Sequence, residues 1–272
     1  MEPSNVQRGF GPRRSPRAIV VSVDNLGEAS ELERGGWAAK AELGRHPSVT
    51  VALPSLLGEL EALGLVATFF VEALNCELYP EEVREIAARG HELGVHGFSH
   101  ERWAKLSARR ERELLVRAGE AFRSLGLEPQ AFRPPGGEAT ERTAGLLREF
   151  GYRWWSPLGE EVSRGDGLGL IPFGWELVDA YHLMDRFGEL RARRGDRREP
   201  LGPRELTERL LFAMERGAGV QTLILHPFLM LDPGWREGAR RVLALIAELG
   251  SAGRSWTVPG GELAAWLASE GR

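Results

Sequence analysis

Residues 18–24 read AIVVSVD, an apolar and mostly β-branched run that ends on an acid. A run of this kind predicts a strand that is buried on both faces, as in a parallel sheet covered by helices. Similar runs are LVATFFVE at 65–72 and VQTLILH at 220–226. Between them the spacing is that of amphipathic helices, for example PEEVREIAARG at 80–90 and REGARRVLALIAELG at 236–250. This alternation indicates an α/β fold with mostly parallel strands.

About eight such strand–helix units predict a closed β/α barrel rather than an open sheet, although periodicity alone does not decide between them. The chain has 272 residues, which suits one large α/β domain or two small ones. We expect residues 1–16 to be a flexible leader and residues 17–272 to form a single domain. The most polar segment, 186–203, is interpreted as a surface excursion and not as a domain boundary.

Composition argues against several classes of function. The formal net charge is −4 and the pI is about 6.0, so the sequence does not indicate a nucleic-acid-binding surface. Cys76 is the single cysteine, which excludes an internal disulfide framework. No apolar run is long enough to span a bilayer, and the N-terminus lacks the apolar segment of a signal peptide. We therefore expect no membrane partner and a cytoplasmic location, while homo-oligomer formation stays open.

Unusual residues stand at the ends of five expected strands. These residues are Asp24 with Asn25, His96, Arg133, Trp155 and His226. The carboxyl ends of the strands of a β/α barrel meet at one face, where active sites are built. We therefore expect these side chains to share one site.

His96 and His100 are four residues apart in the segment HGFSH. If a helical turn follows the strand, both rings lie on the same side and can bind one divalent ion. For zinc, the nitrogen–metal distance would be about 2.0–2.1 Å. A pair of histidines bonded to backbone carbonyls explains the spacing equally well.

Five segments together resemble the polysaccharide deacetylases, the family 4 carbohydrate esterases. The segments are SVDNLG at 22–27, ATFFV at 67–71, HGFSH at 96–100, RPPGG at 133–137 and LILH at 223–226. They occur in the order that the family has. The resemblance implies a distorted (β/α) barrel with seven or eight mostly parallel strands. It also implies metal-dependent hydrolysis of an acetamide or a similar C–N bond.

The resemblance implies a metal site with Asn25, His96 and His100 as ligands. The ion would be zinc or another divalent metal. Asn25 stands where the family has an aspartate, and its amide oxygen can bind a hard cation but brings no charge. Two alternatives are that Asp24 enters the coordination sphere or that Glu28 substitutes. Asn25 can also be a loop residue that caps its own backbone.

The resemblance also implies catalytic roles. Asp24 matches the general base, Arg133 the residue that orients this base, and His226 the general acid that protonates the leaving amine. Gly136, beside Pro135, matches a position whose backbone N–H helps to bind the oxyanion. A carboxylate next to a cation stays ionised and can accept a proton at neutral pH, and histidine can return one.

Two further residues are candidates for substrate binding. Of the pair at 154–155, one tryptophan is expected to face each way, and Trp155 is a candidate for an aromatic wall. The segment IPFGWELVDAYHL at 171–183 resembles one found in the family's intracellular branch, which includes allantoinase-like and cyclic-imide-hydrolysing relatives. Asp179 is therefore a candidate for the pocket, and a helix cap explains it equally well.

Three functions follow from these patterns. The first is N-deacetylation of a small or soluble, carbohydrate-like N-acetylated compound. The second is hydrolysis of a cyclic amide, imide or ureide on the same scaffold. The third is a catalytically inactive relative that binds a ligand, for which the asparagine at position 25 is the only support.

Overall fold

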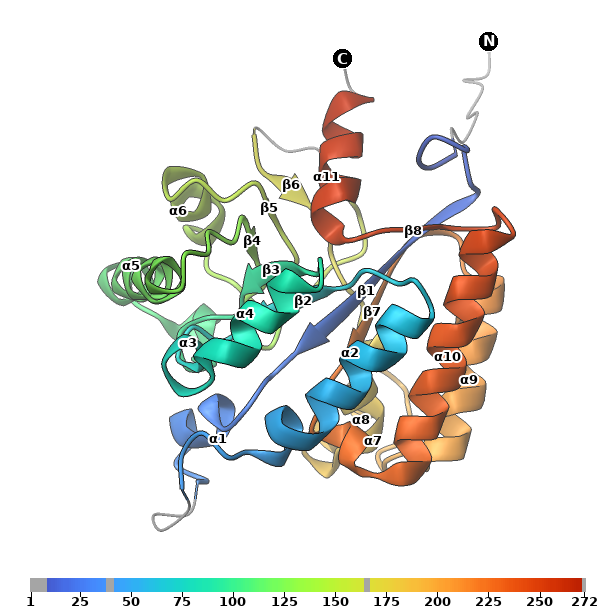
Figure 1. Cartoon of the computed structure of the whole chain (residues 1–272), viewed down its shortest axis with the longest axis horizontal. Coiled ribbons are helices and arrows are strands. Elements are labelled where there is room, and N and C mark those ends of the chain that lie inside the picture. Colours follow the sequence, from blue (N-terminus) through green and yellow to red (C-terminus); the bar gives the residue numbers. More distant parts are fainter. Residues whose placement is uncertain (1–8, 38–41, 164–166, 271–272) are drawn as a thin grey trace.

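A curled, all-parallel sheet forms the centre of the computed structural model, which describes residues 9–37, 42–163 and 167–270 (Figure 1). Along the sheet the order is β6-β5-β4-β3-β2-β1-β7, and β8 pairs with the start of β1. The strands are β1 (Arg17–Asp24), β2 (Thr68–Val71), β3 (Glu92–Val95), β4 (Ala131–Phe132), β5 (Trp154–Trp155), β6 (Gly169–Leu170), β7 (Gly219–Leu225) and β8 (Trp256–Thr257). The predicted distorted barrel in a single domain is confirmed.

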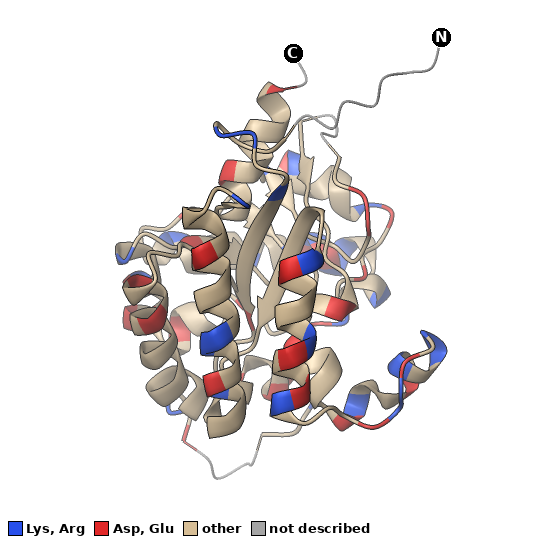
Figure 2. Cartoon of the chain, turned by 90° about the vertical axis from the view of Figure 1, so that its right-hand side faces the viewer, with Lys and Arg blue, Asp and Glu red and all other residues tan. Residues whose placement is uncertain are grey.

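Helices follow the strands, and most of them cover the outside of the sheet (Figure 1). They are α1 (Ala29–Glu33), α2 (Leu53–Ala62), α3 (Asn75–Leu78), α4 (Pro80–Ala88), α5 (Ala108–Ser124), α6 (Thr143–Glu149), α7 (Asp179–Leu183), α8 (Gly188–Arg193), α9 (Pro203–Arg216), α10 (Pro233–Ser251) and α11 (Gly260–Ser269). Charges of both signs alternate along the helices in Figure 2. Within the described ranges, the helices are all too short or too polar to cross a membrane.

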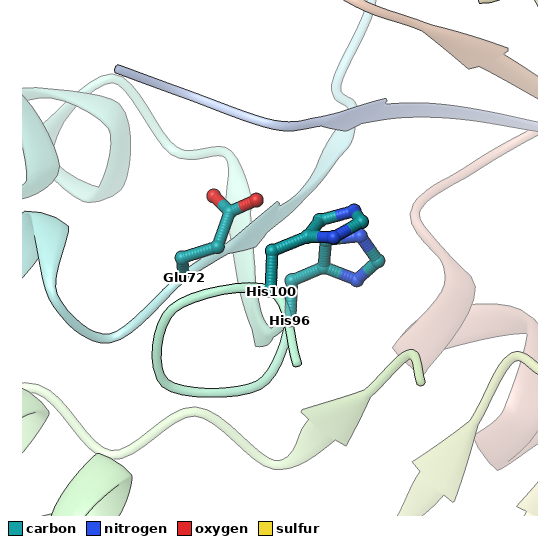
Figure 3. A group of neighbouring side chains, drawn as sticks. All are labelled: Glu72, His96 and His100. Carbon is teal, nitrogen blue, oxygen red and sulfur yellow. The ribbon is translucent and has the colours of Figure 1, made fainter. Parts of the chain in front are cut away.

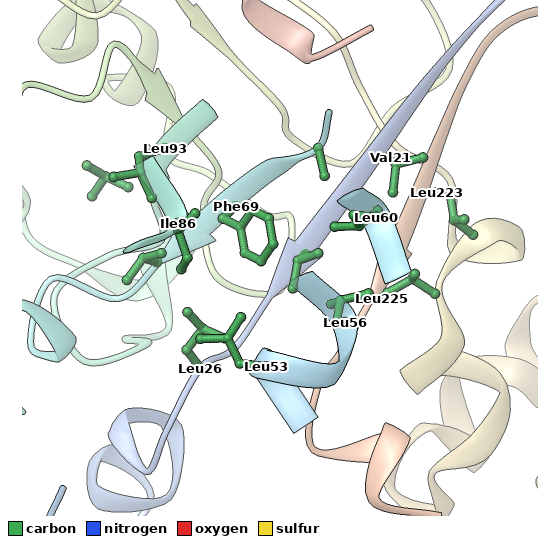
Figure 4. Packing of buried hydrophobic residues seen from close by; sticks show 14 of the residues in the cluster. Val21, Leu26, Leu53, Leu56, Leu60, Phe69, Ile86, Leu93, Leu223 and Leu225 are labelled. Carbon is green, nitrogen blue, oxygen red and sulfur yellow. The ribbon is translucent and has the colours of Figure 1, made fainter. Parts of the chain in front are cut away.

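Alternation along β1 separates two cores. Ile19, Val21 and Val23 point outward and pack with the helices in the larger cluster (Figure 4). Ala18 and Val20 point inward and belong to a second cluster that fills the barrel interior. Because side chains on a strand alternate with period two, the same inward face continues through the next even positions toward the carboxyl end of the strand.

The amino end of the barrel interior is filled by α11. Leu263 and Leu267 of this helix join Phe70, Ala131 and Trp154 in the inner cluster. Figure 1 shows α11 on the side of the sheet where β1 begins. The amino end is therefore plugged by the chain itself, which leaves the carboxyl end for a site.

The barrel is distorted where the sheet ends. A bridge between Val178 and Ile224 brings the segment after β6 alongside β7. Thr222 Oγ1 donates to Pro172 O over 2.8 Å in the same gap. This segment carries residues that line the cavity described below.

The structure describes all of the polar segment 186–203 and part of the expected leader at 1–16. The segment 186–203 contains α8. Buried Arg191 of this helix donates to the carbonyls of Tyr181, Met184 and Arg198, so the segment is held in place by hydrogen bonds. Of the expected leader, residues 1–8 lie outside the described residues. Phe10 pairs with Ser15 and packs on Trp266 of α11.

Candidate active site

The inward-facing residues at the carboxyl ends of the strands form one cavity of about 800 Å³. A cavity of this size suits a small organic ligand. Its lining includes the predicted residues Asp24, Asn25, His96, His100, Arg133, Pro135, Gly136 and His226. The strand ends therefore converge as the sequence predicts.

A buried ion pair joins β1 to β4 inside this cavity. Arg133 Nη1 donates to Asp24 Oδ1 over 2.7 Å and to Ser22 Oγ over 2.9 Å, and Nη2 donates to Ser156 Oγ over 2.9 Å. Burial lowers the pKa of Arg133, and the charge of Asp24 opposes this shift. Arg133 therefore fixes Asp24 through Oδ1 and makes no hydrogen bond to Oδ2.

The two histidines lie in a bend and not in a helical turn, so that part of the sequence prediction is wrong. Gly97 and His100 both have positive φ, at 73°. A Cβ at position 97 would approach Pro135 Cγ to 3.0 Å, which explains the glycine. Glu101 holds the bend by accepting from the N–H groups of Phe98 and Ser99. The imidazole centroids end 5.0 Å apart.

A carboxylate completes this pair, and it comes from Glu72, which the sequence analysis missed. One ligand atom from each of Glu72, His96 and His100 lies within 4.8 Å of the others (Figure 3). Glu72 is fully buried, its Oε1 has no hydrogen-bond partner in the described part of the chain, and burial raises its pKa well above the usual value. A buried carboxylate with an unpaired oxygen beside two imidazoles is a donor set that fits a divalent cation such as zinc.

A hydrogen bond fixes the tautomer of His96 that coordination of such a cation requires. Its Nδ1 lies 2.9 Å from the carbonyl oxygen of Arg133, so the proton must be on Nδ1 and Nε2 keeps its lone pair. Nε2 lies 3.9 Å from Asp24 Oδ2. Burial lowers the pKa of His96 to about 3, so the ring is neutral and able to coordinate at neutral pH.

His100 is neutral as well but has a different partner. Burial and the neighbouring His96 lower its pKa well below the usual value. Arg34 Nη2 lies 3.2 Å from His100 Nδ1 and can only donate to it. Coordination through Nε2 would move the proton to Nδ1, and Arg34 would then need another acceptor.

Of the two alternatives for the charge missing at Asn25, Asp24 stays close to the histidines, with Oδ2 3.9 Å from His96 Nε2, and Glu28 does not reach them. Glu28 is buried elsewhere: it accepts from Tyr79 Oη and Gly44 N, so it serves the loop around α1. Asn25 adopts a positive φ of 58° and lines the cavity. Its buried Oδ1 has no hydrogen-bond partner among the described residues, so a neutral oxygen donor is available there.

His226 is held by Asp179, which the sequence analysis assigned to substrate binding. Asp179 is wholly buried and is absent from the cavity lining, so that assignment is not supported. Its Oδ1 lies 2.5 Å from His226 Nδ1, and its Oδ2 accepts from His226 N over 2.9 Å and from Trp235 Nε1 over 3.2 Å. This carboxylate fixes the imidazole through Nδ1, so Nε2 is the ring nitrogen left for other partners.

The aromatic wall comes from another segment than expected. Trp154 is buried inward and Trp155 packs outward against the helix-side core, as the expected one-each-way arrangement requires. Trp155 is therefore outside the cavity, and its assignment to substrate binding is wrong. Phe173, Trp175 and Phe187 line the cavity instead, with Trp175 5.6 Å from Phe173 and 5.4 Å from Phe187 between ring centroids.

A turn after β4 supplies backbone donors. Gly136 and Gly137 have φ of 75° and 83°, and the N–H of Gly137 bonds to Pro134 O. The N–H of Gly136 has no acceptor within the described residues, although the residue lines the cavity. It is free to bind a developing oxyanion.

Comparison with known proteins agrees with this geometry. Residues 46–155 match the family model described as polysaccharide deacetylase. Over this segment the chain is similar to the polysaccharide deacetylase family. Peptidoglycan deacetylase of Helicobacter pylori is 31% identical over 105 residues, which are 38% of this chain and 36% of that protein. Peptidoglycan-N-acetylglucosamine deacetylase of Bacillus cereus is 36% identical over 89 residues, 32% of each chain. The matches thus span about a third of these relatives.

Solved structures match over nearly the whole chain. A Mycobacterium smegmatis protein assigned as a polysaccharide deacetylase has a TM-score of 0.80 and 27% identity, covering 96% of this chain and 93% of that one. PuuE allantoinase has a TM-score of 0.74 and 16% identity, covering 96% and 92%. At that identity the second similarity concerns the fold alone.

Proposed function

We propose that this protein is a member of the polysaccharide deacetylase family and a metal-dependent hydrolase that removes an acetyl group from the nitrogen of a small, carbohydrate-like compound. One observation carries the proposal. The Glu72, His96 and His100 group lies beside the Asp24–Arg133 pair, and the same cavity contains a histidine held by Asp179. Deacetylase names among the relatives support the choice of an N-acetyl group.

In this proposal Glu72, His96 and His100 hold the cation, and Asn25 Oδ1 is an additional neutral donor. When bound, the cation polarises the amide carbonyl and makes a water molecule more acidic. Zinc suits the two imidazoles and one carboxylate, and other divalent ions remain alternatives.

The remaining steps belong to side chains and backbone. Asp24, oriented by Arg133, accepts a proton through Oδ2 from the water that attacks the amide carbon. The N–H of Gly136 donates to the oxygen that gains negative charge. His226 donates a proton from Nε2 to the leaving amine while Asp179 stabilises the imidazolium. Acetate and a free amine result.

The test compares two buried glutamates. Glu72→Gln should weaken zinc binding at least about 100-fold, because it removes the only anionic ligand of the group. Glu28→Gln is the matched control and should bind zinc as the wild type does. Isothermal titration and metal analysis of the purified proteins measure both. Equal zinc affinity in wild type and Glu72→Gln would contradict the proposed metal site.

Turnover is followed as acetate released from a panel of N-acetylated sugars. Asp24→Asn should keep zinc and lower kcat about 1,000-fold, since it removes the proton acceptor and the counterion of Arg133 but none of the three proposed metal ligands. Asn25→Asp should tighten zinc binding if the amide oxygen is a ligand. A wild-type protein that holds zinc and opens a cyclic ureide without releasing acetate would instead establish the cyclic-amide function.

A further inference from the structure

Four cationic side chains line the cavity together. They are Arg34, which caps the C-terminus of α1, Arg102 and Lys105 in the segment after the two histidines, and Arg186 before α8. In the part of the chain that the structure describes, all four lack an ion pair with a carboxylate. Arginines on the helices differ: Arg109, for example, pairs with Glu113 over 2.7 Å.

We call the part of the cavity lining that carries these four cations the rim. The carboxylates beside them already have hydrogen-bond or ion-pair partners. Glu33 accepts from Ser99 Oγ over 2.7 Å. Glu101 accepts from the N–H groups of Phe98 and Ser99 and holds the histidine bend. Asp24 is paired with Arg133. The rim therefore carries an excess of positive charge that no neighbouring carboxylate neutralises by direct contact.

These cations also disfavour one another. Burial, followed by the charge of Arg34, lowers the pKa of Arg186 to about 10. Burial and then Arg102 lower the pKa of Arg34. A guanidinium with a pKa of about 10 is still charged at neutral pH, so like charges remain crowded around one cavity. An anionic ligand would relieve this repulsion, and the planar guanidinium matches the oxygens of phosphate and carboxylate.

Arg34 connects this rim to the reaction site. Its present acceptor, His100 Nδ1, becomes a donor if His100 coordinates a cation through Nε2. Arg34 would then lose this acceptor at the moment when the site becomes active. An oxyanion on the ligand would replace it.

We propose that the substrate of this cavity carries an oxyanion, a phosphate or a carboxylate, which Arg34, Arg102, Lys105 and Arg186 bind while its amide faces Asp24 and His226. The placement of the substrate's amide beside Asp24 and His226 rests on the proposed function. Phe173, Trp175 and Phe187 flank the space that the body of the substrate would occupy. The rim thus selects anionic N-acyl compounds over neutral ones.

Calorimetric binding of matched probes tests this selection. The probes are N-acetylglucosamine, its 6-phosphate, and N-acetylmuramic acid as the carboxylate arm. We expect at least one anionic probe to bind about tenfold or more tightly than the neutral sugar, with the advantage falling as salt is added. The stronger of the two anionic probes identifies which oxyanion the rim prefers.

Two variants and a control locate the effect. Arg102→Gln and Arg186→Gln should each weaken the preferred anionic probe about tenfold and leave the neutral sugar within about twofold. Arg84→Gln, on the exposed face of α4 and outside the cavity, should change neither. Equal affinity for neutral and anionic probes, no saturable binding of either anionic probe, or a preference that survives both variants would overturn the inference.

Binding to His96→Ala separates this inference from the proposed function. That variant should lose hydrolysis and retain the charge preference. Hydrolysis of a neutral sugar by a wild-type protein without charge preference would refute the anionic substrate alone. Charge-selective binding by a protein that hydrolyses none of the probes would refute the proposed function and leave the anionic site in place.

Discussion

The two ends of the barrel interior are built by the same strands. They differ in whether their buried polar atoms have hydrogen-bond partners. At the amino end Glu92 is satisfied on both oxygens, by Thr68 Oγ1, Trp154 Nε1 and the N–H of Gly261. At the carboxyl end, Asn25 Oδ1, Glu72 Oε1 and Arg133 Nε are buried without a partner among the described residues. Buried polar atoms are normally paired, and three unpaired ones at this end can bind a ligand. Asn75 Oδ1 and Gln221 Oε1 are also unpaired among the described residues, so an unpaired atom alone does not identify the site.

This difference teaches that one face of a strand can serve stability at one end and chemistry at the other. Val20 and Asp24 of β1 point into the same interior, four residues apart. The apolar end stabilises the barrel by removing surface from water. The polar end costs stability, because charged groups are desolvated there, and provides function. Substitutions at the two ends should therefore have separable effects.

The largest expected effect is on stability, at the amino end. Trp154→Ala removes a ring that is 1% exposed and packs edge-on against Phe70 at 5.5 Å between centroids. Truncating a buried tryptophan should lower the free energy of unfolding by about 3–5 kcal/mol. Urea unfolding measures this loss. Turnover of the folded variant should stay within about threefold of wild type, since the ring does not line the cavity.

Trp154→Phe is the matched control. It keeps an aromatic ring, removes the indole donor to Glu92 Oε1 and loses a smaller part of the buried side chain than alanine does, so it should cost about 1–2 kcal/mol. Loss of most turnover in a folded Trp154→Ala protein would show that the two ends are not separable.

The separation of the two ends follows largely from the sequence, because period-two alternation fixes which side chains point inward. Asp24, His96, Arg133 and His226 are predictable as residues that end strands. Glu72 could have been found in the same way, since it continues the inward positions of TFFV at 68–71. The expectation for Trp155 fails by the same rule, because its neighbour Trp154 takes the inward position.

The rest of the site depends on loops and cannot be obtained from local patterns. Arg34, Arg102 and Arg186 come from three separate connections, and only the closed barrel brings them to one rim. Asp179 is recognisable as a helix start, and its actual contact with His226 crosses 47 residues of sequence. Tertiary contacts of this kind have no period in the sequence.

At the carboxyl end, the expected effect is on turnover. Asp179→Asn should lower kcat about 100-fold, since it removes the negative charge behind the His226 imidazole and disturbs its tautomer. KM and zinc affinity should stay within about twofold. A purely structural role would lower stability and leave kcat of the folded variant unchanged, whereas the positioning role lowers kcat of a protein that remains folded. An unaltered kcat would remove Asp179 from this role.

The smallest effect should appear at the boundary between the two ends and should touch both properties. Ser22 Oγ donates to Leu223 O over 3.0 Å and accepts from Arg133 Nη1 over 2.9 Å. Ser22→Ala should cost about 1 kcal/mol of unfolding free energy and lower kcat about fivefold, because Arg133 retains Asp24 and Ser156 as partners. Thr222→Val, which removes a bond to Pro172 O and no contact with Arg133, should lower stability by a similar amount and leave kcat unchanged. If both variants changed kcat equally, the boundary would act through general packing of the barrel and not through the orientation of Arg133.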